Sequence, residues 1–178
     1  ILGNNSIIDI NSSGFFTIVL ILVLGLVICT GAMNVFNFMD GINGITGGYS
    51  LIVLSAILFI LDRETLLGKS SEVETIVSLL KIVLSAALVF CFFNFRSRAK
   101  CFAGDVGSVS IAFIILFTLG YIVINTGDLS WLSFLVVYGV DGCLTILHRI
   151  MLHENISQPH RKHLFQIMAN ELKIPHVI

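Results

Sequence analysis

The 178-residue chain is too apolar to be covered by a surface that faces water. Apolar residues make up 56% of it and charged residues only 12%, whereas a soluble domain carries about a quarter charged residues. The formal net charge is −1, so the chain has no overall positive charge to attract nucleic acid, and we expect no nucleic-acid partner. The four cysteines form no CxxC pair and no zinc spacing, and we interpret them as structural. The expected solvent is the lipid bilayer.

Five apolar segments are long enough, or nearly so, to cross a bilayer as helices, which takes about 20 residues. Helices are expected because backbone groups in lipid must pair within their own segment, and the apolar runs do not alternate as barrel strands would. The predicted fold class is therefore all-α, a polytopic transmembrane helical bundle forming a single membrane domain over residues 1–178. The expected spans are 15–32, 45–61, 73–93, 106–125 and 129–150.

Basic residues concentrate in the connecting segments on one side of the predicted bundle. Segments 33–44, 94–105 and 151–178 share that side, and the opposite side carries mostly acidic residues. The positive-inside rule therefore predicts that these three segments are cytoplasmic. Two charged residues, Lys81 and Asp141, lie well inside spans, away from the ends. Asp141 is either functional or paired with a neighbouring helix, and Lys81 either snorkels outward or sits against another helix.

The first unusual segment follows the first span and carries polar side chains at a spacing of three. Asn37, Asp40 and Asn43 form this row, and Asn34 extends it by one step. On a helix end such spacing places side chains on one face. Their oxygens suit a hard cation, and their amides can bind a nucleobase edge. The alternative is an ordinary turn between two spans, since Asn, Asp and Gly dominate turns.

The second segment is Gly104-Asp105-Val106-Gly107-Ser108, at the expected start of the fourth span. Asp105 could cap that helix and complement its dipole. It could equally bind Mg²⁺, which takes one or two carboxylates and completes its shell with water and phosphate oxygens. The two interpretations are compatible.

The third segment is the tail after the fifth span, where four side chains that can carry positive charge follow one another. They are His160, Arg161, Lys162 and His163. Such a cluster can hold a pyrophosphate through forked and single hydrogen bonds. Anchoring at the membrane surface and metal binding by the two histidines are the alternatives.

In this order, the three segments resemble the cytoplasmic signatures of the polyprenyl-phosphate sugar-1-phosphate transferases, the family that includes MraY and WecA. The tail beginning at Pro159 is most similar to WecA-like and WbpL-like bacterial members. The resemblance implies transfer of a sugar-1-phosphate, N-acetylhexosamine-1-phosphate by default, from a UDP-sugar to undecaprenyl phosphate. UMP is released, in the first membrane step of a cell-surface polysaccharide. It also implies a bacterial inner-membrane protein with its active site on the cytoplasmic face. A homodimer is a further expectation.

The resemblance also assigns roles to residues of this chain. Asp105 and Asn37 match the positions that bind Mg²⁺, for which Mn²⁺ is the alternative ion. His160, Arg161 and His163 match the basic loop around the diphosphate, and with Asp105 and Asn37 they form the predicted catalytic set. The predicted substrate-binding residues are Asn34, Asp40, Asn43 and Lys162, of which Asn43 matches the position at the uracil end of the nucleotide.

Members of the family carry two adjacent aspartates in an earlier cytoplasmic loop, and no Asp-Asp pair occurs in this chain. We therefore expect it to be a piece of a longer transferase that lacks the Asp-Asp region and the last span, and to be inactive by itself. A transporter or channel is the main alternative function, and a non-catalytic membrane scaffold is the other. A transporter predicts polar residues near the midplane of several spans, whereas only the enzyme requires the three segments to converge.

Overall fold

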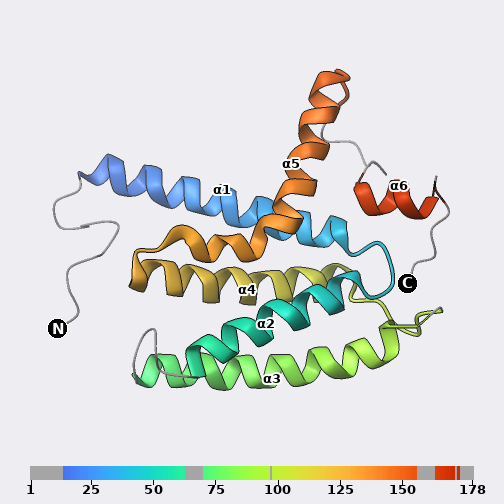
Figure 1. Ribbon diagram of the computed structural model, residues 1–178. Helices are drawn as coiled ribbons and strands as arrows, with labels where there is room; N and C mark the ends of the chain where they lie inside the picture. Colours follow the sequence, from blue (N-terminus) through green and yellow to red (C-terminus); the bar gives the residue numbers. More distant parts are fainter. Residues whose placement is uncertain (1–13, 63–69, 97, 156–162, 171, 173–178) are drawn as a thin grey trace.

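The computed structural model describes residues 14–62, 70–96, 98–155, 163–170 and 172, and every regular element among them is helical (Figure 1). In chain order these are α1 (Phe15–Met39), α2 (Ile45–Asp62), α3 (Ser71–Asn94), α4 (Gly104–Thr126), the 3₁₀ helix η1 (Leu129–Leu135), α5 (Val136–Met151) and α6 (Leu164–Asn170).

The described residues contain five helical segments long and apolar enough to span a membrane, counting η1 and α5 together. This confirms the predicted fold class. Helix α1 continues beyond residue 32, where the sequence predicted the span to end, so that Asn34 and Asn37 lie on its last turns. The predicted fifth span is divided into a 3₁₀ and an α segment. Asp128 caps the 3₁₀ segment by accepting hydrogen bonds from the backbone N–H and the hydroxyl of Ser130, and these lower the pKa of its carboxyl.

The helices are arranged so that α3 packs on α2 and α1 packs on α4, while α4 also contacts α2 and η1. In Figure 1, α5 diverges from the direction of the other long helices. Tyr49 of α2 donates its hydroxyl to the Phe134 carbonyl and so ties η1 to α2. The turn from α1 to α2 and the connection from α3 to α4 lie at the same end of the bundle (Figure 1).

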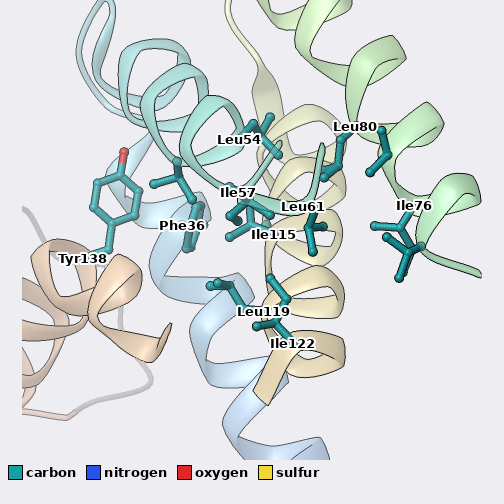
Figure 2. Close-up of a cluster of buried hydrophobic side chains, with 14 of the residues drawn as sticks. Phe36, Leu54, Ile57, Leu61, Ile76, Leu80, Ile115, Leu119, Ile122 and Tyr138 are labelled. Atoms are coloured by element: carbon teal, nitrogen blue, oxygen red, sulfur yellow. The ribbon is translucent and has the colours of Figure 1, made fainter. Parts of the chain in front are cut away.

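The core lies where α2 and α4 face each other, with contributions from the flanking helices (Figure 2). Its side chains are almost entirely aliphatic, as expected of helices that pack by shape in lipid. Outside this core the helices expose apolar residues; Phe16 and Leu26 of α1, for example, are 86% and 69% exposed. The largest core side chains that are completely buried are Phe36, Leu54, Ile57, Leu80, Ile115, Leu119, Ile122 and Tyr138.

Lys81, one of the two charges predicted within spans, forms an ion pair across two helices. Its ammonium lies 2.9 Å from the Asp62 carboxylate at the end of α2, and both side chains are 56% exposed. Of the two interpretations open from the sequence, the structure therefore supports contact with another helix.

Candidate functional site

The first two sequence motifs are in direct contact at one end of the bundle. The Ser108 hydroxyl, on the second turn of α4, donates to Oδ1 of Asn37 on the last turns of α1 at 2.7 Å. Ser108 is fully buried, and its oxygen is also 2.9 Å from the Gly104 carbonyl. The packing of α1 on α4 thus holds Asn37 against Ser108, which lies three residues after Asp105 on the same helix.

Asp105 lies exposed in the first turn of α4. Ala103 occupies the cap position and this helix has no side-chain cap hydrogen bond, so Asp105 does not cap it. Its carboxylate is still favourably placed near the positive end of the helix dipole. Gly104 adopts φ +62°, a left-handed conformation that glycine reaches at little cost. That conformation presents the Asp105 carboxylate at the start of the helix.

The row from Asn34 to Asn43 does not continue along one helix face, contrary to the sequence-based expectation. Helix α1 ends at Met39, Asp40 is its C-cap residue, and Asn43 lies in the following turn. There the Asn43 amide donates to the Arg96 carbonyl at 3.0 Å. Helical periodicity therefore relates only Asn34 and Asn37, because the chain reverses at the next residues through Gly44 at φ +86°.

Asn94 joins the turn after α1 to the connection after α3, and the sequence reasoning missed it. This buried side chain accepts from the Gly44 N–H at 2.6 Å and donates to the Cys101 carbonyl at 2.8 Å. The sequence did contain a signal for it: Asn94 is a polar residue at the end of an apolar span, and a buried amide must find hydrogen-bond partners. The nearby glycines serve helix packing: a Cβ on Gly47 would lie 2.5 Å from Sγ of Cys91.

The third motif is described only from His163 onward; His160, Arg161 and Lys162 lie outside the described residues. His163 is buried, and its Nδ1 lies 2.7 Å from Oδ2 of Asp141 on α5. The other carboxylate oxygen accepts from the Leu164 N–H at 2.9 Å. The His163 ring also lies 6.0 Å, centroid to centroid, from Phe38, the residue after Asn37. The third motif thus reaches the same end of α1 as the other two.

Arg149, which precedes this tail on α5, is also buried. Its guanidinium contacts the Glu154 carboxylate at 3.4 Å and donates to the Asn155 carbonyl. These bonds close the chain reversal after α5, so this arginine organises the start of the tail.

The donor set at this end of the bundle fits a magnesium ion that is completed by substrate. Among the described residues, no three His, Cys, Asp or Glu side chains come together as a preformed cage. Magnesium rarely uses such a cage and keeps several waters and phosphate oxygens. The exposed carboxylate of Asp105, and the Asn37 amide bound to Ser108 three residues further along α4, are donors of that kind.

Comparison with known proteins identifies the family. Residues 2–142 match the model of glycosyl transferase family 4. The chain therefore belongs to this family. The matched range includes the first two motifs and Asp141.

Similar bacterial proteins were found among those of assigned function. A probable undecaprenyl-phosphate N-acetylglucosaminyl 1-phosphate transferase of Bacillus subtilis is 30% identical over 138 residues, covering 75% of this chain and 36% of that protein. A phospho-N-acetylmuramoyl-pentapeptide-transferase of Borrelia hermsii is 34% identical over 107 residues, covering 54% of this chain and 30% of that protein. The chain thus spans about a third of the length of these relatives. No solved structure matches at comparable significance.

Proposed function

We propose that this chain forms part of the active site of an enzyme that transfers N-acetylhexosamine-1-phosphate from a UDP-sugar to undecaprenyl phosphate. The product is a lipid-linked sugar for a cell-surface polysaccharide, and UMP is released. The names of the bacterial relatives and the family match support this class of reaction. The motif-bearing end of the bundle is proposed to face the cytoplasm of a bacterial inner membrane, because the basic residues concentrate there.

One observation carries the proposal most directly. The Ser108–Asn37 hydrogen bond and the His163–Phe38 ring contact bring three motifs, far apart in sequence, to one end of α1. A scaffold has no need for this convergence. A transporter would instead concentrate polar groups near the midplane of its spans.

In the proposed reaction, an oxygen of the lipid phosphate attacks the phosphorus that bears the sugar. A new P–O bond forms, the bond to the bridging oxygen breaks, and UMP leaves with that oxygen. The protein has to position two anions and neutralise the charge that develops. Mg²⁺, or Mn²⁺ as the alternative, would polarise phosphate oxygens when bound. Asp105 and Asn37 would hold it, and Ser108 orients the Asn37 amide for that task.

The remaining predicted residues would bind the substrates around this centre. Asn34 and Asp40 flank Asn37 on the α1 end, and Asn43 stands in the following turn, where its bond to the Arg96 carbonyl fixes its position. His160, Arg161 and Lys162 would supply positive charge to the diphosphate, as forked and single donors do.

The test is magnesium-dependent UMP release from UDP-GlcNAc by the complete protein with undecaprenyl phosphate. Asp105→Asn keeps the size of the side chain but removes its charge, and we expect release to fall by about 100-fold, a typical loss for a group that stabilises transition-state charge. The matched control is Asp128→Asn, which alters an exposed carboxylate in the connection between α4 and η1 and should leave release unchanged.

Unchanged release in Asp105→Asn would remove Asp105 from the metal site while leaving the activity standing. The proposed function itself would be refuted if folded wild-type protein released no UMP from any UDP-N-acetylhexosamine.

A further inference from the structure

Asp141 carries a charge inside a span. Its partner could not be identified from the sequence, and the proposed reaction gives it no role. It lies on α5 within the apolar fifth span, and its side chain is 11% exposed. A carboxylate at such a depth is costly unless hydrogen bonds compensate it. Its two oxygens face different donors: Oδ2 contacts the His163 ring, and Oδ1 accepts the Leu164 N–H.

The two contacts together determine the protonation of the His163 ring. An ionised carboxylate can only accept hydrogen bonds, so with Asp141 ionised the 2.7 Å contact places a proton on Nδ1. With the proton there, Nε2 is the acceptor of the neutral ring or the second donor of the charged one. The side chain of His163 is only 4% exposed, so little water competes for this bond, which makes it directional and its loss costly.

The pair also fixes where the ring stands. Oδ1 accepts the N–H of the residue that follows the histidine, and the Gln166 side chain accepts from the His163 N–H at 3.3 Å, so that the backbone on both sides of the ring is held. The Thr145 hydroxyl, one turn along α5 from Asp141, lies 3.5 Å from Nδ1 and borders the same contact. Phe38 packs at the ring from the end of α1.

We propose that Asp141 is a positioning residue: its carboxylate fixes His163 as the tautomer protonated on Nδ1 and orients its ring toward the site at the end of α1. The role in transfer rests on the proposed function. Acting through His163, Asp141 thereby sets whether Nε2, the other ring nitrogen, accepts or donates a hydrogen bond during the reaction.

Asp141→Asn tests this proposal, because a backbone hydrogen bond fixes the orientation of the new side-chain amide. The Leu164 N–H keeps the amide oxygen on its side, so the amide NH₂ faces Nδ1 and donates to it. The substitution preserves shape and one hydrogen bond but moves the ring proton to Nε2. Asp62→Asn is the matched control, because it makes the same chemical change in the exposed ion pair with Lys81. Asp62 is the last residue of α2, whereas the site lies near the turn where α2 begins.

The first measurement needs no activity. In ¹⁵N NMR spectra of the complete protein labelled at histidine, with His163 assigned from His163→Gln, we expect Nδ1 to be protonated in wild type and in Asp62→Asn. In Asp141→Asn we expect Nδ1 to be unprotonated at the same pH. Unprotonated Nδ1 in wild type, or an unchanged tautomer in Asp141→Asn, would overturn the proposal.

The second measurement is UMP release by the same variants. Asp141→Asn should lower kcat by about 10- to 100-fold, the cost seen when a carboxylate behind a metal-bound histidine is removed. In the His163→Gln background it should cost little more, since its effect passes through that ring. Equal losses with and without His163 would reduce Asp141 to a structural residue. Inactive wild-type protein would refute the proposed function, while the NMR result would still decide the tautomer.

Discussion

The contact between Ser108 and Asn37 makes a quantitative prediction about the candidate site. Ser108→Ala removes the hydroxyl that donates to Asn37 Oδ1 at 2.7 Å. An acceptor left unsatisfied in a buried position costs about 1–3 kcal/mol. Because Asn37 is only half-buried, water can reach it in part, and we expect the low end, about 1 kcal/mol. The replaced oxygen is small, so the cavity adds little.

This loss should appear mainly in catalysis. If the freed Asn37 amide rotates away from its productive orientation, about 1 kcal/mol lost from transition-state binding lowers kcat/KM about fivefold. We would measure UMP release with saturating magnesium, and thermal unfolding of the detergent-solubilised complete protein. The melting temperature should fall by no more than about 4 °C.

Ser110→Ala is the control, because Ser110 is exposed on the same helix two residues further on. It should match wild type in both measurements. The reasoning is refuted if Ser108→Ala also keeps wild-type kcat/KM, since the hydrogen bond would then orient nothing that the reaction uses. A loss of stability equal to that of a misfolded protein would also refute it, because the predicted cost is only about 1 kcal/mol.

Two glycine substitutions test the local backbone. Gly47→Ala should lower the melting temperature, because the new Cβ would lie 2.5 Å from Cys91 Sγ. Gly120→Ala is the control: a Cβ there meets no atom within 4 Å, so this change should be neutral or slightly stabilising in a helix. Equal melting temperatures for the two variants would contradict this packing. Gly104→Ala should lower the stability by about 1 kcal/mol although the space is open, because φ is +62°. A stability equal to that of wild type would show that the backbone at the start of α4 relaxes to accept the side chain.

Much of the architecture follows from the sequence alone. Long apolar segments in a chain with 12% charged residues leave helices that cross lipid as the expected solution, because backbone groups there must be satisfied within each segment. The order of the three motifs also indicated the family correctly. The chemistry of the side chains in the first and second motifs predicted that both belong to one site, and Asn37 and the Gly104–Ser108 segment are adjacent in the structure.

Tertiary structure decided what periodicity could not. Spacing suggested one polar face from Asn34 to Asn43, but the helix ends at Met39 and the chain turns. The Asn94 bridge between two connections and the Asp141 bond to His163 join residues 50 and 22 positions apart. Such pairings depend on how helices pack side by side, and no local pattern encodes them. From a buried polar side chain one can infer only that it has a hydrogen-bond partner, and the fold determines which residue that partner is.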